Sequence, residues 1–450
     1  MSTTSLKNAP EPTGHWFFGS LLDFARDIPG FVLNLRAQHG PVVRFRLLRG
    51  INYLISDPQL IGEILNDKQD RFIKNRGFWI RFTGIFGQGL LTSEGETWKR
   101  QRKLAAPAFQ PKRLAHYVDI VTERAQALTA QWQNGQVRDV HDDLMQVTAE
   151  VIAKAMFGVD LEDENHGIRD AVHQLEKQIA IRMVRPFYFL DFLPLPNNLR
   201  YWKTLRYIDS RIKTFITAHR SESADQRTLL AMLMDARDES GAPMSDKQLR
   251  DETITMFLAG HDTTAISVSW AIYLLSQSPD YWALLREEWQ QVLQDEPPTW
   301  ASLQNLNLTR GVIKESLRLY PPAYLFGREP VNDVDIGGFH VPKGVGVVIS
   351  PYVMGRHPTY FENPDLFDPK RWTPEFEKTL PRYAFIPFGG GPRTCMGEGF
   401  AMMEAMVLLV ALGRRFTLEY TGASAPLPLP SITLPPREGL KMRVVEVKAG

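Results

Sequence analysis

The sequence predicts a mainly α-helical protein with short β-strands near both ends of the chain. From Trp98 to about Ser278, nearly every segment spaces its apolar residues as a helix requires. Beyond Pro330 the pattern changes to short apolar runs separated by Gly and Pro, which is typical of strands and turns. Between Pro41 and Asp57, apolar residues alternate across an Arg-Gly turn, which is the spacing of a β-hairpin.

The composition is that of a large globular protein. Apolar residues make up 44% of the 450 residues and charged residues 23%, so a substantial core can form. We expect one domain over residues 1–450, with β-containing parts near residues 41–57 and 331–450 and a helical body at about residues 98–320.

The charge balance and the cysteine content limit the kinds of partner and the cellular compartment that the sequence supports. The 52 basic residues balance 51 acidic ones, so net charge gives no support for nucleic-acid binding. A single cysteine excludes an intrachain disulfide and favours a reducing compartment. Residues 1–19 are polar and interrupted by proline, unlike a signal peptide or a membrane-spanning helix. We therefore expect a cytoplasmic protein without a transmembrane anchor.

Two helix starts are marked by capping residues. Asp57 can cap a short helix whose first turn contains Pro58. Ser245 and Gln248 form the pattern of a capping box, and the helix that they begin should run to about Gln277, the longest in the chain.

The one cysteine lies in a glycine-rich loop, residues 388–397, just before the apolar helical run 400–412. Backbone N–H groups at the start of a helix stabilise a thiolate, so this position suits a reactive or ligating Cys395. Glycines at 389–391 permit unusual backbone conformations and allow close approach to a flat ligand. A small buried cysteine in a turn is the competing interpretation.

This loop resembles the ligand loop of the cytochrome P-450 family, Phe-x-x-Gly-x-Arg-x-Cys-x-Gly. The matching residues are Phe388, Gly391, Arg393, Cys395 and Gly397. The resemblance implies that Cys395 is the axial ligand of a haem b iron, that Arg393 meets a haem propionate and that Phe388 packs near the sulfur. A thiolate ligand favours O–O cleavage over reversible oxygen binding, so we expect a monooxygenase that uses O2.

The resemblance also implies the fold. It is mainly α with small β-sheets, and the haem lies between the long oxygen-binding helix and the helix that follows the cysteine loop. In this fold the pair Glu315 and Arg318, three residues apart, is joined by an arginine from a later Pro-x-Arg-aromatic segment, here Arg371. We expect these three residues to support the haem loop structurally rather than to act in catalysis.

The long helix carries a polar cluster, residues 259–264, among apolar neighbours. Threonine hydroxyls there could simply bond a carbonyl one turn back and bend the helix. The cluster resembles the family's oxygen-binding groove, which implies that Thr263 holds dioxygen and a water and that Asp262 relays protons. Such a relay is needed because O–O cleavage consumes two protons in a site that excludes bulk water.

Three further residues are candidates for binding the haem propionates. Trp98 and Arg102, one helical turn apart, match the family's Trp-x-x-x-Arg. Arg328 occupies a position where many relatives have another propionate-binding arginine, although a surface role fits nearly as well. All these motifs follow the family's order and span residues 98–397.

The segments that line substrate pockets in the family are apolar here. They predict a lipophilic substrate, such as a fatty acid, terpene or steroid-like molecule, that is hydroxylated or epoxidised. Aromatic stripes are more often core, so the lining is an expectation only. Its members are Phe78, Phe82, Phe86, Ala259, Ala323, Tyr324 and Leu325. The apolar segment at residues 179–202 suits ordinary packing, a lid or a weak membrane contact.

The chain shows no flavin or iron–sulfur motif after Cys395, so we expect electrons from a ferredoxin or flavodoxin-type donor with its reductase. An acidic donor would dock near Lys99, Arg100, Lys103 and Arg382, and we expect a monomer. Competing functions are a haem-thiolate peroxygenase or isomerase, a haem-binding sensor and a cysteine-nucleophile enzyme. The Asp262–Thr263 pair argues against a sensor, since binding alone needs no proton relay.

Overall fold

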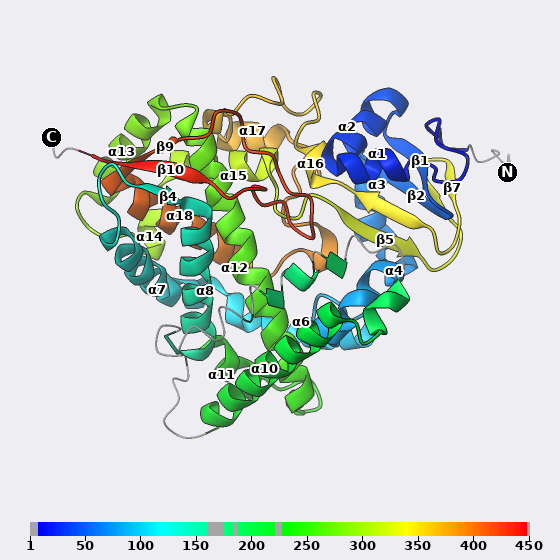
Figure 1. Ribbon diagram of the computed structural model, residues 1–450, viewed down its shortest axis with the longest axis horizontal. Coiled ribbons are helices and arrows are strands. Elements are labelled where there is room, and N and C mark those ends of the chain that lie inside the picture. The colour runs from blue at the N-terminus through cyan, green and yellow to red at the C-terminus, as the bar shows by residue number, and fades with distance from the viewer. Residues whose placement is uncertain are drawn as a thin grey trace. The chain divides into compact units, whose positions relative to one another are not determined.

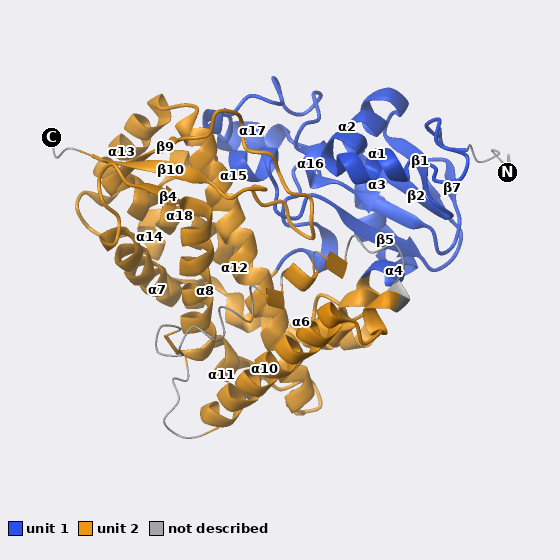
Figure 2. Cartoon of the chain, in the orientation of Figure 1, with its two compact units in different colours: residues 1–78, 314–395 blue, residues 79–313, 396–450 orange. Residues whose placement is uncertain are grey.

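The computed structural model describes residues 8–160, 171, 174–175, 177–179, 181–182, 188–220 and 227–447 (Figure 1). The chain divides into two compact units (Figure 2). Unit 1 comprises residues 1–78 and 314–395, and unit 2 comprises residues 79–313 and 396–450.

Unit 1 contains a five-stranded sheet. β1 (Val42–Leu47) and β2 (Gly50–Ile55) form the predicted antiparallel hairpin. β8 (Gly346–Ile349) runs parallel to β2, β5 (Phe326–Pro330) runs antiparallel to β8, and β3 (Phe72–Lys74) pairs antiparallel with β5. The strand order is β1-β2-β8-β5-β3. A separate two-stranded sheet pairs β6 (Val334–Ile336) with β7 (Phe339–Val341).

The helices of unit 1 are mostly short. Asp57 caps α3 (Pro58–Gly62) as predicted, because its side chain accepts bonds from the N–H groups of Gln59 and Leu60 at 2.9 and 3.1 Å. A π-helical turn, η1 (Glu63–Asp67), follows directly. The other helical elements are α1 (Leu21–Arg26), α2 (Ile28–His39), η2 (Gln69–Arg71), α4 (Arg76–Trp79), the end of α15 (Asn307–Leu319), α16 (Pro351–Met354), η7 (Pro369–Arg371), α17 (Pro374–Thr379) and η8 (Gly391–Arg393).

Unit 2 is mainly helical and is built around α12 (Asp246–Ser276). The predicted capping box is present: the N–H of Gln248 donates to Ser245 Oγ at 3.3 Å, and the N–H of Ser245 donates to Gln248 Oε1 at 3.1 Å. α12 packs against α8 (Val140–Phe157) and α18 (Glu398–Arg415). The apolar half of α12 from Ala265 onward is buried and forms much of the core of this unit.

The remaining helices of unit 2 surround this centre. They are η3 (Ile80–Phe82), α5 (Thr83–Phe86), α6 (Gly95–Ala105), η4 (Ala106–Phe109), α7 (Pro111–Ala130), η6 (Tyr188–Phe192), α10 (Pro196–His219), α11 (Leu229–Asp235), α13 (Asp280–Leu293) and α14 (Trp300–Leu303). Proline and glycine mark two of the helix ends. α7 begins at Pro111, and Gly158, in the left-handed region at φ 73°, ends α8.

The prediction that strands lie only near both ends of the chain was incomplete. β4 (Val137–Asp139) interrupts the expected helical body and pairs with β10 (Lys441–Glu446), which also pairs with β9 (Phe416–Tyr420). β4 has three residues, too few for a recognisable alternation, and its pairing partner lies about three hundred residues later in the chain. β3 lies outside the expected ranges for the same reason.

Among the helices in the described ranges, none combines the length and the apolar character needed to cross a bilayer.

Candidate functional site

Cys395 ends a tightly closed loop three residues before α18. Its backbone N–H donates to the carbonyl of Phe388 at 2.9 Å. The backbone N–H and the hydroxyl of Thr394 both donate to the carbonyl of Gly391, at 3.1 and 2.8 Å. The Cys395 side chain is exposed, which excludes the competing interpretation of a small buried cysteine. The loop holds the thiol in a fixed place at the start of a helix, where N–H groups favour a thiolate.

The glycines of this loop meet two different requirements. Gly389 and Gly391 have φ of 75° and 67°, a region that other residues rarely adopt. A Cβ on Gly391 would lie 2.0 Å from the backbone oxygen of Leu65 in η1. Gly390 has an extended backbone, but a Cβ there would lie 2.6 Å from the ring of Tyr383. The loop therefore packs directly on the backbone of η1, which fixes its shape.

The middle of α12 breaks an otherwise buried helix. Ala259 is exposed and Asp262 and Thr263 are partly exposed, whereas Thr264 is buried. The Thr263 hydroxyl donates to the Ala259 carbonyl at 2.8 Å, the local bond that the sequence allowed. One face of α12 in unit 2 thus borders open space at the turn where the sequence placed the polar cluster.

His261, to which no role was assigned, lies on the buried side of the same turn. Its exposure is 2%, and its Nδ1 lies 3.2 Å from the carbonyl oxygen of Phe257.

The four predicted propionate-binding residues lie on three kinds of element. In α6, the Arg102 guanidinium lies 5.9 Å from the centre of the Trp98 ring, so both side chains share one face as predicted. Arg328 lies on β5, where it pairs with Lys74 of β3 and Val347 of β8. Its Nη1 donates to the carbonyl of Gly327 at 3.0 Å. Arg393 ends η8, two residues before Cys395. Arg102, Arg328 and Arg393 are partly exposed, whereas Trp98 is buried.

These residues fit a haem. An exposed cysteine before a helix offers a soft thiolate ligand for iron. The arginines of α6, β5 and η8 can form charge-assisted bonds to carboxylates. Within unit 2, the exposed turn of α12 has small residues at Ala259 and Gly260 and a hydroxyl at Thr263.

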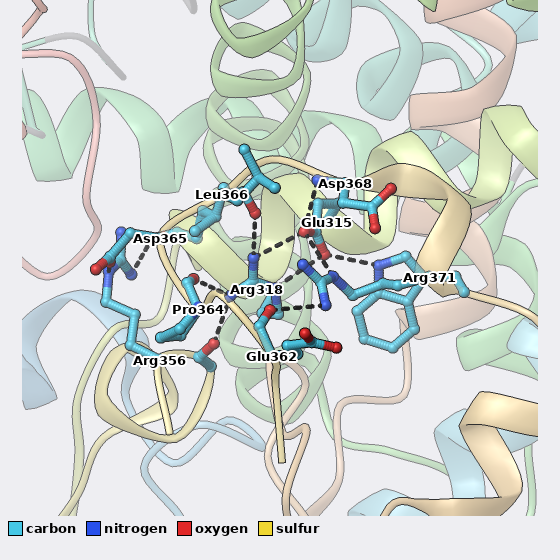
Figure 3. Close-up of polar contacts among 12 residues, drawn as sticks. Glu315, Arg318, Arg356, Glu362, Pro364, Asp365, Leu366, Asp368 and Arg371 are labelled. Carbon is cyan, nitrogen blue, oxygen red and sulfur yellow. Dashed lines mark hydrogen bonds and ion pairs between the residues drawn. The ribbon is translucent and has the colours of Figure 1, made fainter. Parts of the chain in front are cut away.

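Glu315 and Arg318 form a fully buried ion pair on α15 (Figure 3). Arg318 Nε and Nη2 donate to the two carboxylate oxygens of Glu315 at 2.9 and 2.7 Å. The remaining N–H groups of Arg318 donate to the carbonyls of Gly355, Pro364 and Leu366, the first at 2.7 Å and the last at 2.9 Å. All five donors of this guanidinium are thereby satisfied.

Glu315 receives three more donors from the segment that follows. Arg371 Nε donates to Glu315 Oε1 at 3.0 Å, as the sequence predicted for this trio. The Trp372 indole N–H and the Asp368 backbone N–H also donate to the carboxylate, at 2.9 and 3.0 Å. A buried carboxylate with five donors is strongly stabilised, so the network fixes residues 355–372 against α15.

Sequence reasoning missed two members of this region. Trp372 was recognised only as an aromatic residue, although its indole N–H is part of the network. Arg356 packs 3.8 Å from the ring centre of Tyr352, and its Nη1 donates to the Leu319 carbonyl at 2.5 Å. Burial lowers the pKa of Arg356. The Pro-x-Arg-aromatic motif includes Trp372 but does not show where its indole N–H points, and Arg356 belongs to none of the motifs.

The predicted substrate-pocket residues differ in exposure. Phe82 is fully buried, with its ring 6.1 Å from that of Trp79, and Tyr324 is almost fully buried. Phe86 is 5% exposed, while Phe78, Ala259 and Ala323 are exposed and Leu325 is partly exposed. The sequence shows which segments are apolar, but the short helical turns at residues 76–86 decide which side chains face inward.

One predicted donor-docking residue also binds a loop of the protein itself. Arg100 is held by Asp238, with Nε 2.6 Å from its carboxylate, and also donates to the Pro243 carbonyl. Bonds from Ser240 and Arg100 lower the pKa of Asp238. Lys99 and Lys103 form exposed ion pairs with Glu96 and Glu239, and Arg382 is exposed. Arg100 is therefore less exposed to a partner than these three residues.

Glu404, on α18, is a buried acid that sequence reasoning did not single out. It is 1% exposed, and neither carboxylate oxygen has a hydrogen-bond partner among the described residues. Burial raises its pKa from 4.5 to about 8; Thr264 and His261 lie near enough to oppose this, but the Thr264 hydroxyl donates to Gly260 instead. The sequence gives one sign of this buried acid: Glu404 is the one acidic residue within the apolar run at residues 400–412.

The comparisons agree with the motifs. The sequence profile of the family described as Cytochrome P450 matches residues 9–441. Cyclooctatin synthase of Streptomyces melanosporofaciens is 33% identical over 98% of this chain and 95% of its own length. Pentalenene oxygenase of Streptomyces avermitilis is 33% identical over 92% of each chain. The crystal structure of the cytochrome P450DA haem domain superimposes with a TM-score of 0.91 at 26% identity, covering 98% of both chains. The family resemblance and the fold class predicted from sequence are therefore confirmed, and the chain belongs to the cytochrome P450 family.

Proposed function

We propose that the protein is a haem b monooxygenase that hydroxylates or epoxidises a terpene, with Cys395 as the iron ligand. The reaction class follows from the family: the protein is an oxygen-incorporating oxidoreductase with a haem-thiolate cofactor, and it uses O2, a lipophilic substrate and a redox partner. The observation that carries the residue assignment is the exposed Cys395, held by the Phe388 carbonyl at the end of the matched loop.

We assign the haem contacts to residues of the motifs that match the family. Cys395 would supply the thiolate, with Phe388, Gly391 and Gly397 shaping its loop. Arg393, Arg328, Arg102 and Trp98 would hold the propionates. Glu315, Arg318 and Arg371 hold residues 355–372 in place and have no part in the chemistry. When bound, the haem-thiolate supplies O2 binding and cleavage of the O–O bond.

The protein's own catalytic contribution is proton delivery. The Thr263 hydroxyl, partly exposed on the open turn of α12, donates to the Ala259 carbonyl and can accept a hydrogen bond from a water. Asp262 is its partly exposed neighbour in the chain. These two side chains would carry the protons that the reaction consumes.

The terpene class is supported by the relatives and by the apolar side chains near the site. Two relatives at 33% identity are the terpene oxygenases cyclooctatin synthase and pentalenene oxygenase, and a third, at 30%, is named cyclooctat-9-en-7-ol 5-monooxygenase. Phe78 and Leu325 are apolar and at least partly exposed, so they can contact a hydrocarbon. An apolar lining with few polar groups favours a hydrocarbon skeleton over a carboxylate substrate.

For the partner, we propose an acidic ferredoxin or flavodoxin-type donor that docks on Lys99 and Lys103 of α6 and on Arg382. We also propose one monomeric domain, since the family match runs through both units. The cytoplasm suits a single cysteine that must stay reduced.

The test is a binding and turnover screen with haem-loaded protein. Cyclic terpene hydrocarbons should shift the spin state of the haem and yield a mono-oxygenated product with a ferredoxin system and its reductase. A response to fatty acids or steroids alone would contradict the substrate class. Turnover with peroxide but not with O2 and electrons would favour a peroxygenase.

A further inference from the structure

Large apolar side chains are exposed from the end of η6 to the first turn of α10. Phe192, Leu193, Leu195 and Leu199 are 61, 42, 38 and 50% exposed. Four such residues within eight positions are unusual on the surface of a water-soluble helix, because each leaves apolar area in water.

The polar residues of the same turn point inward. Asn198 is buried, and its Nδ2 donates to the carbonyls of Leu190 and Leu193, both at 2.7 Å. Asp191 is 1% exposed. Arg182 is also buried, and its guanidinium lies 3.8 Å from the centre of the Tyr201 ring. The backbone is therefore fixed with its polar groups inside and its leucines outside. This inverted pattern indicates that the apolar side chains meet something other than water.

Basic residues continue the same outer surface along α10. Arg200, Lys203, Arg206 and Lys213 are exposed at helical spacing, and none of them forms an ion pair within the described part of the chain. The one acid in the helix, Asp209, is bound by Arg250 of α12, whose Nε and Nη2 lie 2.8 and 2.6 Å away. Figure 2 shows α10 along the lower edge of unit 2.

We propose that this α10 surface, formed by Phe192, Leu193, Leu195, Leu199, Arg200, Lys203, Arg206 and Lys213, docks on an anionic lipid bilayer. Apolar side chains would enter the region between head groups and acyl chains, and the basic residues would meet the lipid phosphates. The pairing of an apolar tip with a basic flank matches that layered environment.

Other occupants fit the charge less well. A second copy of the chain docked through the same surface would bring the basic residues of both copies together, and like charges repel. An acidic protein would pair with the basic flank, but it would need an apolar groove for four large side chains. A bilayer supplies the negative charge and the apolar phase at once.

Vesicle binding tests this proposal with the full, haem-loaded protein. The protein should sediment with vesicles of phosphatidylcholine mixed with phosphatidylglycerol, should bind pure phosphatidylcholine much more weakly, and should lose binding at high salt. The double variant Lys203→Glu/Arg206→Glu should bind at least about 25-fold more weakly, since each basic residue near an anionic surface contributes about 5-fold. Leu193→Ser/Leu199→Ser should also reduce binding at every salt concentration.

Matched controls lie elsewhere in unit 2. Lys112→Glu/Arg113→Glu changes two exposed basic residues of α7, and Leu427→Ser changes a leucine that is 61% exposed. Both should bind like the wild type. If a double variant fails to fold, Lys203→Gln and Leu199→Ser replace it, and about 5-fold weaker binding is expected from the lysine change.

Three results would overturn the proposal. The wild type could fail to bind anionic vesicles, or the α10 variants could bind as well as the controls. Mass measurement could also show a dimer that Leu193→Ser/Leu199→Ser dissociates, which would assign the surface to self-association. None of these readouts depends on the substrate, so the monooxygenase assignment stands or falls separately.

Discussion

At the scale of single residues, Glu404 shows how strongly burial changes chemistry. Its carboxyl is buried near Thr264 and His261 of α12 and lacks hydrogen-bond partners among the described residues. Desolvation penalises the charged form, so the group stays protonated at neutral pH. The sequence marks Glu404 as an acid in an apolar run, but only packing shows that its carboxyl is desolvated.

This acid should make stability depend on pH. The folded state keeps a proton between pH 4.5 and about 8 that the unfolded chain has released, so the free energy of unfolding falls as pH rises through that window. The full effect above pH 8 is at most about 5 kcal/mol. Glu404→Gln keeps the shape and removes the titration. The difference in unfolding free energy, variant minus wild type, should rise from pH 5 to pH 8 and then level off; a difference independent of pH would contradict the burial argument.

Thr263 and Thr264 offer a matched pair for the proton relay. Thr263 is partly exposed on the open turn, whereas Thr264 is 1% exposed on the other side of α12. Thr263→Ala should divert electrons to peroxide and lower product formation by at least about tenfold, since a positioned proton donor contributes about 10²–10⁴. Thr264→Ala should leave the ratio of product to electrons consumed near wild type. Equal coupling in both variants would remove Thr263 from the relay.

At the scale of elements, the Glu315 network shows what motif spacing reveals and what it does not. The Glu-x-x-Arg spacing predicts one ion pair and the family adds Arg371. The backbone carbonyls of residues 355–366 lie in a segment without regular structure, and the Trp372 indole directly follows the short η7, so no periodicity marks which groups turn inward. These additional donors and acceptors are what make the buried charges tolerable.

Removing one partner of this network should be costly. Arg371→Ala takes one charged donor from the buried Glu315 carboxylate and should lower the free energy of unfolding by about 3–5 kcal/mol. Trp372→Phe removes a neutral donor and should cost about 1–3 kcal/mol. Denaturant unfolding of the haem-loaded protein measures both. A change below about 1 kcal/mol for Arg371→Ala would show that the network does not hold this segment.

The α6 surface allows a test of donor docking. The ion pair between Lys103 and Glu239 is exposed on both sides, so reversing the charge of Lys103 should leave stability within about 1 kcal/mol. Lys103→Glu should slow the first reduction by an acidic ferredoxin several-fold and weaken its dependence on salt. The exposed Lys247 at the start of α12 provides the control, Lys247→Glu. Stopped-flow reduction that is unchanged by both substitutions would exclude α6 as the docking surface.

At the scale of the whole molecule, long helices were the most predictable part of the fold. α12 could be placed from its capping box and its length, and the hairpin of β1 and β2 from alternation. β4 could not, because a three-residue strand is defined only by its distant partner, β10. The orientation of Phe82 and Tyr324 likewise depends on tertiary packing, since an apolar segment presents side chains to both the core and the site.

The central claim is that Cys395 ligates a haem iron, and one spectrum tests it directly. Purified protein is reduced with dithionite under carbon monoxide, beside the Cys395→Ser variant. The account predicts a strongly red-shifted Soret band in the wild type and its loss in the variant, because only a thiolate ligand produces that shift. A carbonyl spectrum typical of histidine ligation, or the same red-shifted band in Cys395→Ser, would contradict the account.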